Sequence, residues 1–194
     1  MATDAPAALP FEPAQIRWTN LWWVAAALIA MIAVIRADNL WALNFLHISA
    51  GLLWTGIDLF MGFVVGPALR RTPFEVRRGV MTQLTPRTMF LLPTLAIVTG
   101  TTGWYLALSM GYLAAPWPGY WWVVASLAVV TVLTVQGIGL LLPTQIRVYL
   151  ELIKPEPDRA RIARLSASYF YLIALQGIMQ VAIIAIMARF RMGL

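Results

Sequence analysis

Hydrophobic residues gather along the chain in five long segments, which short polar stretches separate. A bilayer core about 30 Å thick needs roughly 20 apolar residues of helix, and these segments reach or approach that length. The first is the shortest, because the polar stretch RADN closes it. The pattern predicts transmembrane helices at 20–36, 40–66, 88–110, 119–142 and 166–188. We expect residues 1–19 to form an N-terminal tail and residues 20–194 to form one transmembrane domain.

Composition supports a membrane protein and removes several kinds of site. Of the 194 residues, 61% are hydrophobic and only 11% are charged, and the mean hydropathy is +0.77. Soluble domains are about 45–50% apolar and about 25% charged, so the chain is predicted to be an integral, all-α membrane protein. It contains no cysteine, which excludes disulfides, thiolate metal sites and a cysteine nucleophile.

Basic residues lie beside the predicted spans, mainly in two connecting segments. Residues 67–87 and 143–165 each contain five arginine or lysine residues, whereas the other side has Arg36, Arg189 and Arg191. The positive-inside rule therefore places both segments and the N-terminus in the cytoplasm. The same distribution explains the net charge of +6 without nucleic-acid binding, which we do not expect. The excess of arginine over lysine is typical of a GC-rich bacterial genome, which suggests the bacterial inner membrane.

One stripe of the second predicted helix carries every unusual residue of that helix. Six positions recur at the spacing of about 3.6 residues per turn and so share one face. These are His47, Gly51, Trp54, Asp58, Gly62 and Val65. The glycines would let another helix or a flat group approach closely. His47 and Asp58 are eleven residues apart, or about 16 Å along the axis, so they are not predicted to bond to each other.

Asp58 is the most costly residue in this segment. An ionised side chain at mid-bilayer costs about 2.5–3.5 kcal/mol on insertion scales, and such residues usually face a protein interior and have a partner. Candidate partners are Gln136 in the fourth span, Gln176 and Gln180 in the fifth, and Arg87 at the start of the third. The third span adds hydroxyl groups as candidates for Asp58 or His47: Thr99, Thr101, Thr102 and Ser109. We therefore predict that Asp58 is functional or charge-paired.

His47 is the only histidine in the chain, and three roles are open to it. A neutral imidazole nitrogen could ligate a metal or haem iron, the ring could carry protons near neutral pH, or it could bond a neighbouring helix. A bis-histidine haem within one chain is excluded. Several methionines near the spans would suit copper(I) or a haem axial position: Met31, Met61, Met89, Met110, Met179 and Met187.

Sequence motifs assign no reaction. The chain contains no phosphate-binding Walker loop, no dinucleotide-binding glycine pattern, and no HExxH or GxSxG motif. Whether the protein is an enzyme stays open at this point.

The stretch HISAGLLWTGIDLF, followed by GPALRR, resembles a superfamily of small bacterial membrane proteins. This superfamily includes the CopD-type copper-resistance domain and the HemJ-type, haem-associated proteins. The shared pattern is a histidine at a helix start, a Trp-x-Gly about seven residues later and then an aromatic residue. The stretch MTQLTPRTMFLLPTLAIVTGTTGWYLAL is similar to the second helix of the family, and PWPGYWWVVASL to the third.

The resemblance covers residues 40–142 and implies a four-helix core, to which the first span is an N-terminal addition. It also implies that haem b is associated with His47, and that copper is the alternative metal. The face of His47, Gly51, Trp54 and Asp58 would then be the cofactor site.

Three functional hypotheses follow. The first is a redox-linked protein that binds haem b through His47, with Asp58 or Arg87 serving a propionate or a proton path. The second is a transport protein for copper or another small solute. The third is a non-catalytic subunit that packs into a larger membrane complex or a homo-oligomer. The lipid bilayer is a partner in all three.

Overall fold

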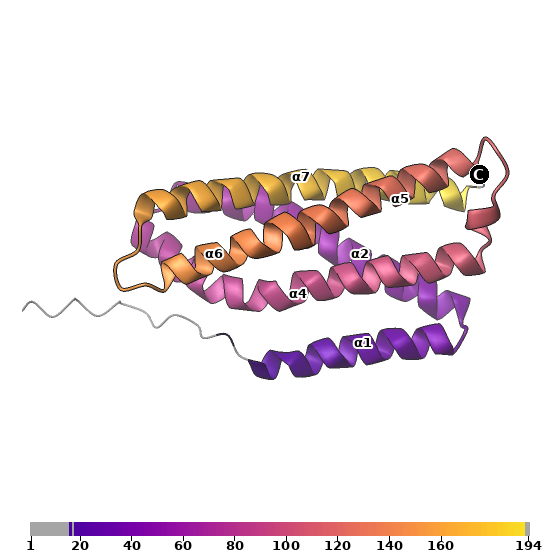
Figure 1. Cartoon of the computed structure of the whole chain (residues 1–194), viewed down its shortest axis with the longest axis horizontal. Helices are drawn as coiled ribbons and strands as arrows, with labels where there is room; N and C mark the ends of the chain where they lie inside the picture. Colours follow the sequence, from indigo (N-terminus) through magenta and orange to yellow (C-terminus); the bar gives the residue numbers. More distant parts are fainter. Residues whose placement is uncertain (1–15, 17, 193–194) are drawn as a thin grey trace, which may run out of the picture.

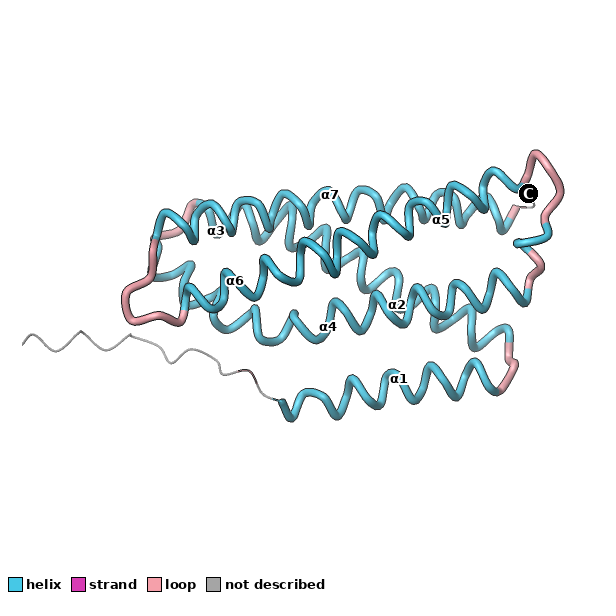
Figure 2. The backbone as a smooth tube through the Cα atoms, viewed as in Figure 1, coloured by secondary structure: helices cyan, strands magenta, loops and turns pink. Residues whose placement is uncertain are grey.

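The computed structural model describes residue 16 and residues 18–192, and every regular element in that part is helical. Two π-helical segments interrupt helices without ending them, so the elements form five continuous rods (Figure 2). The first rod is α1 (Leu21–Arg36), the second is α2 (Leu40–Phe60), η2 (Met61–Val65) and α3 (Gly66–Arg70), and the third is α4 (Phe74–Ser109). The fourth is α5 (Tyr120–Thr134), η4 (Val135–Leu141) and α6 (Leu142–Leu152), and the fifth is α7 (Arg159–Arg191). Two short 3-10 segments, η1 (Trp18–Asn20) and η3 (Tyr112–Ala114), complete the list.

Four of these rods are long and apolar enough to cross a membrane. They are Leu40–Arg70, Phe74–Ser109, Tyr120–Leu152 and Arg159–Phe190. The predicted all-α class is confirmed, together with four of the five predicted spans by length and composition. Helix α1 is shorter, with 16 residues, and its length of about 24 Å is less than a bilayer core of about 30 Å.

The helices extend well past the predicted spans at one end of the bundle. Helix α4 begins at Phe74 rather than 88, and α7 begins at Arg159 rather than 166. The prediction that residues 67–87 are a connecting segment between spans is therefore wrong, because α3 and α4 cover all of them except 71–73. Hydropathy detects only the length of helix that matches the lipid, whereas arginine and other polar helix formers continue the helix beyond it. Asp158 starts α7, because its side chain accepts a hydrogen bond from the backbone N–H of Arg161 at 2.9 Å.

The rods pack side by side, with α1 at one edge (Figure 1). Helix α2 lies along α4, and α7 packs against α2, α5 and α6, while α6 also packs against α4. The loops 71–73 and 153–158 lie at the same end of the bundle, which we name the arginine-rich end; it is at the left in Figure 1. The loops 37–39 and 110–119 lie at the opposite end.

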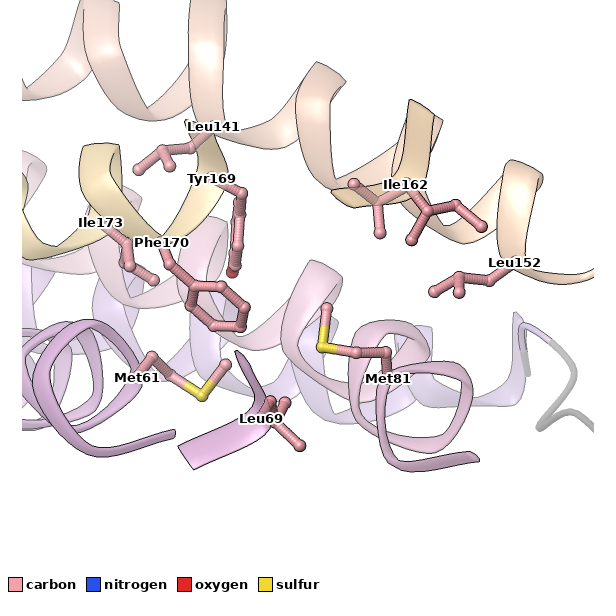
Figure 3. Packing of buried hydrophobic residues seen from close by; sticks show 10 residues of the cluster. Met61, Leu69, Met81, Leu141, Leu152, Ile162, Tyr169, Phe170 and Ile173 are labelled. Atoms are coloured by element: carbon pink, nitrogen blue, oxygen red, sulfur yellow. The ribbon is translucent and has the colours of Figure 1, made fainter. Parts of the chain in front are cut away.

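The main hydrophobic core lies toward the arginine-rich end. Its buried members come from all four long rods: Met61, Leu69, Met81, Leu141, Val148, Leu152, Ile162, Tyr169, Phe170 and Ile173. Figure 3 shows Met61 and Met81 on either side of the Phe170 ring, with Tyr169 beside it. A smaller cluster of Met31, Ala50 and Val98 attaches α1 to α2 and α4.

Two glycines of the second rod bring it very close to α7. A Cβ atom on Gly62 would lie 2.7 Å from the Cα atom of Ala174, and one on Gly66 would lie 2.7 Å from the Phe170 ring. Real Cβ atoms essentially never approach a neighbour so closely, so these positions accept no larger residue without a shift of the helices. Small residues have this use in membrane bundles, because they let backbones come together.

Candidate functional site

Asp58 lies at the centre of a buried polar cluster between α2 and α7. Its side chain is fully buried, with an exposed fraction of 0%. Its Oδ2 atom accepts hydrogen bonds from the Nε2 atoms of Gln176, at 2.8 Å, and Gln180, at 3.0 Å. The two glutamines are one turn apart on α7 and are also buried. The structure therefore brings Asp58 to two of its predicted candidate partners, Gln176 and Gln180.

The candidates Gln136 and Arg87 have other partners. Gln136 donates its Nε2–H to the backbone oxygen of Leu172 at 2.6 Å, so it joins η4 to α7 without contacting Asp58. Arg87 is exposed, and its guanidinium donates to the backbone and side-chain oxygens of Gln83 on the same helix. The proposed pairing of Arg87 with Asp58 is therefore wrong, because Arg87 projects from an exposed position of α4.

Two aromatic side chains complete the surroundings of Asp58. Trp54, one turn earlier on α2, is buried, and its indole interacts with the carboxylate. Tyr169 of α7 is buried as well and lies within electrostatic reach of Asp58. No arginine, lysine or histidine among the described residues forms an ion pair with this carboxylate.

His47 contacts α4 through one edge of its ring. Its Nδ1 atom lies 3.0 Å from the backbone oxygen of Thr99 and 3.3 Å from the hydroxyl of Thr102. The Thr102 hydroxyl donates its own proton to the oxygen of Val98 at 2.6 Å. Both contacts at Nδ1 are therefore acceptors, and the hydrogen-bond pattern assigns the proton to Nδ1. The Nε2 atom makes no hydrogen bond within the described residues and carries a free lone pair.

Gly103 makes room for this ring. A Cβ atom at position 103 would lie 2.7 Å from the Cε1 atom of His47 and 3.2 Å from its Nδ1 atom. A glycine in the interior of α4 costs about 1 kcal/mol relative to alanine. The histidine therefore occupies a notch that any larger residue at position 103 would close.

The predicted stripe is divided between two neighbouring helices. His47 and Gly51 face α4, and a Cβ atom on Gly51 would lie 3.4 Å from the Thr99 side chain. Asp58 and Gly62 face α7. The glycines thus pack against helices, which is the first of the two alternatives predicted for them. Val65, at the end of the stripe, packs partly buried against the main core.

Metal ligands other than His47 do not gather in the described part of the chain. It contains no group of three or more His, Cys, Asp or Glu residues that could hold a metal ion. Met61 and Met81 belong to the main apolar core, and Met31 belongs to the small cluster that attaches α1. These three methionines pack against carbon atoms.

The sequence did not identify Arg78 as a buried residue, because Arg78 was counted only among the basic residues that set the topology. Its side chain is 3% exposed. Its Nε atom donates to the backbone oxygen of Leu152 at 2.8 Å, and its Nη2 atom donates to that of Lys154 at 2.6 Å. Arg78 thus caps the C-terminal end of α6 from α4, where the helix dipole favours a cation. The capping role of Arg78 could be predicted only from the start of α4 at Phe74, which places Arg78 within a helix.

Two further buried polar residues of α6 were also missed. Gln145 donates to the hydroxyl of Thr88 at 2.6 Å and so links α6 to α4. Glu151 is buried and lies 2.8 Å from the Lys154 ammonium and 3.6 Å from the Arg161 guanidinium. The arginine-rich end is therefore a network of specific contacts between α4, α6 and α7.

A groove lies at the opposite end of the bundle, between α1, α2 and α4. Its volume is about 640 Å³, and none of the predicted site residues lines it. The wall is formed by Ile35, Arg36, Asp38, Leu40, Leu43, Tyr105 and Ser109.

Comparison of the chain with family models, curated proteins and solved structures gave no significant match. The similarity to the CopD-type and HemJ-type superfamily therefore stays a prediction from the motifs at 46–107. What the structure adds is a multi-pass helical bundle with two separate polar sites, one at His47 and one at Asp58.

Proposed function

We propose that the chain is a multi-pass protein of the bacterial cytoplasmic membrane that holds a redox-active metal centre at His47, with haem b as the group. One observation carries this proposal. The Nδ1–H of His47 is held by a backbone carbonyl, and Nε2 is free. Metal-ligating histidines almost always have this arrangement, because the second hydrogen bond fixes the tautomer and the ring orientation and raises the basicity of the ligand nitrogen.

The hydrogen bonds of His47 fit a haem ligand. The imidazole is neutral by its hydrogen-bond pattern, and it is held in the notch that Gly103 leaves beside it. Bound haem iron would supply one-electron transfer at this position. Thr99 and Thr102 would keep Nε2 directed at the iron.

The supporting roles suggested for Asp58 and Arg87 are not retained. Asp58 is about 16 Å from His47 along α2 and is already held by two amides. Arg87 lies sixteen residues before Gly103 on α4, or about 24 Å away along the axis. Neither residue is at the level of a group bound to His47.

A visible spectrum tests the proposal. We expect protein purified in mild detergent after haem-supplemented expression to show a Soret band and a sharpened α band after dithionite. His47→Ala should abolish both. The absence of a Soret band in the wild-type protein would contradict the haem proposal, and it would leave the interpretation as a non-catalytic subunit of a larger membrane complex. A band that survives His47→Ala would move the ligand to another residue.

Copper transport receives less support from the described residues. Soft thioether ligands would be needed beside His47, whereas Met61 and Met81 pack in the apolar core near the other end of the bundle. We therefore retain copper only as a second metal to be tested at His47 by the same variant.

A further inference from the structure

We propose that Asp58, Gln176 and Gln180 form a binding site for a small monovalent alkali cation, of which Na⁺ is the representative. The site lies between α2 and α7 and does not involve His47. The proposal rests on unpaired buried oxygen atoms, on charge balance and on the rigidity of the surrounding helices.

Several oxygen atoms of the cluster have no hydrogen-bond donor. Both glutamine Nε2 atoms donate to Oδ2 of Asp58. Three oxygens remain buried without any hydrogen-bond partner within the described residues, Oδ1 of Asp58 and the Oε1 atoms of Gln176 and Gln180, and the neighbouring Tyr169 hydroxyl is unpaired as well. The three residues are at most 3% exposed. Buried polar atoms are usually satisfied, and each unsatisfied one costs about 1–3 kcal/mol.

The unpaired oxygens are grouped around Oδ2 of Asp58. Each Oε1 belongs to an amide whose nitrogen lies within 3.0 Å of Oδ2. Amide and carboxylate bond lengths then place each of the three oxygens within about 5 Å of Oδ2.

A bound cation pairs the unpaired atoms more simply than a proton does. A proton on Oδ1 would provide one new donor for one Oε1 atom, and the other Oε1 atom would still need the Tyr169 hydroxyl as its donor. A single cation would accept electron pairs from all three oxygens at once. Carboxylate and amide oxygens are ligands for hard cations, whereas copper(I) prefers sulfur.

Charge balance indicates that the ion is monovalent. Asp58 contributes one negative charge, and no basic side chain among the described residues lies within ion-pair distance of it. An unpaired charge is very costly in a low-dielectric interior. A monovalent cation makes the site neutral, whereas a divalent ion would leave one positive charge without a partner.

The frame around Asp58 is too tight to rearrange freely. Gly62 approaches the backbone of Ala174, and a Cβ atom on Gly177 would lie 2.8 Å from the Leu59 side chain. These close approaches flank Asp58 along the contact between α2 and α7. Such a frame fixes the positions of the oxygens and so favours a small ion.

Thermal unfolding in detergent at constant ionic strength tests the proposal. We expect the melting temperature to rise with the logarithm of NaCl concentration, by at least about 5 °C at a hundredfold excess over Kd. KCl should be less effective, and choline chloride should have no effect. Binding of radioactive sodium to the purified wild-type protein should be saturable.

Variants assign the effect to the site. Asp58→Asn keeps an acceptor for the two glutamines and should abolish the sodium dependence and the binding of radioactive sodium. Gln176→Leu and Gln180→Leu should each weaken sodium binding by at least about tenfold. Glu75→Gln is the matched control, because Glu75 is a half-exposed acid paired with Arg159, and it should leave sodium binding unchanged.

Several results would overturn the proposal. These are a wild-type protein that binds no radioactive sodium, stabilisation that choline chloride reproduces, and sodium binding that persists in Asp58→Asn. If the Asp58 variant fails to fold, sodium binding by the wild type and by Gln180→Leu decides the question. The visible spectrum of the protein is a separate readout, so haem and cation binding can fail independently.

Discussion

Arg78 is a charged residue in the protein interior whose partners are backbone carbonyls. Its two hydrogen bonds reach the oxygens of Leu152 and Lys154, at the point where α6 ends. The last carbonyls of a helix have no partner within the helix. One side chain therefore satisfies the carbonyl of the last residue of α6 and a loop carbonyl just beyond it, and so joins α4 to α6.

Replacing Arg78 should destabilise the fold. Arg78→Met removes two charge-assisted hydrogen bonds and leaves the carbonyls unpaired, so we expect a loss of roughly 2–4 kcal/mol in the free energy of unfolding. Arg78→Lys should recover only part of this loss, because an ammonium cannot reproduce the planar fork. Denaturation in detergent measures both. Arg71→Met, at an exposed position of the same end, should change stability by less than about 0.5 kcal/mol; an equal loss in Arg71→Met would contradict the capping role.

Gly103 and Gly100 provide a matched pair of residues on one helix. A Cβ atom on Gly103 meets the His47 ring, whereas one on Gly100 meets nothing within 4 Å. Gly103→Ala should displace the imidazole, cost about 1–3 kcal/mol of stability and weaken any group bound at Nε2. Gly100→Ala should be neutral or stabilising by up to about 1 kcal/mol, because alanine favours helix. Thermal unfolding measures the stability of each variant, and the visible spectrum reports any group bound at Nε2. Equal effects of the two substitutions would contradict the close contact between position 103 and the His47 ring.

At the scale of the element, two of the five rods contain a π-helical segment between α-helical segments. The π-helical segments η2 and η4 lie in the two rods that flank α7, and both contact α7. The segment η2 begins three residues after Asp58, and η4 contains Gln136. Single π-helical turns are rare and often mark functional sites.

Contact between the second rod and α7 depends on small residues. Gly62→Ala should push the two helices apart and cost about 1–3 kcal/mol. Gly56→Ala, on an exposed face of the same rod where a Cβ atom meets nothing within 4 Å, is the control and should be neutral or mildly stabilising. Thermal unfolding compares the two. If the proposed cation site is correct, only Gly62→Ala also lowers sodium affinity.

At the scale of the whole molecule, the specific polar contacts concentrate at the arginine-rich end. Arg159 pairs with Glu75 at 3.1 Å and also lies over the Phe74 ring, while Glu151 holds Lys154 and Arg161. The opposite end is rich in exposed aromatic side chains, including Trp117 and Trp121. This asymmetry is typical of a membrane protein whose basic loops face the cytoplasm.

Single cysteines test this orientation, because the native chain contains none. We expect Glu156→Cys, in the loop at the arginine-rich end, to react with an impermeant maleimide only after the cells are permeabilised. Met110→Cys, at the opposite end, should react in intact cells. The reverse pattern would invert the predicted topology.

The sequence predicted the helical spans more completely than the contacts between the helices. Hydropathy located four long spans, because lipid imposes a minimum apolar length. It placed the starts of the third and fifth spans at 88 and 166, whereas α4 begins at Phe74 and α7 at Arg159, and so it missed Arg78. The spacing of His47, Gly51, Asp58 and Gly62 correctly marked a stripe that faces neighbouring helices. It did not say which helix each residue faces, since that depends on how α4 and α7 cross α2.

Partner assignment was limited for the same reason. Gln176 and Gln180 were recognisable as partners of Asp58, because amides four residues apart share one face of a helix. Arg87 was not excluded by its sequence, since its distance from Asp58 depends on where α4 begins and on its rotation. The free Nε2 atom of His47 also required coordinates, because the acceptors at Nδ1 come from a different helix.

The hydrogen bonds to Oδ2 of Asp58 have a consequence for the geometry of α7. Each residue of a helix turns the chain by about 100°, so a rotation of α7 by one residue would carry both amides away from the carboxylate together. Because both donors converge on one acceptor atom, a rotation of α7 disturbs both hydrogen bonds at once. The Asp58 carboxylate thus helps to set the rotation of a helix of 33 residues about its own axis.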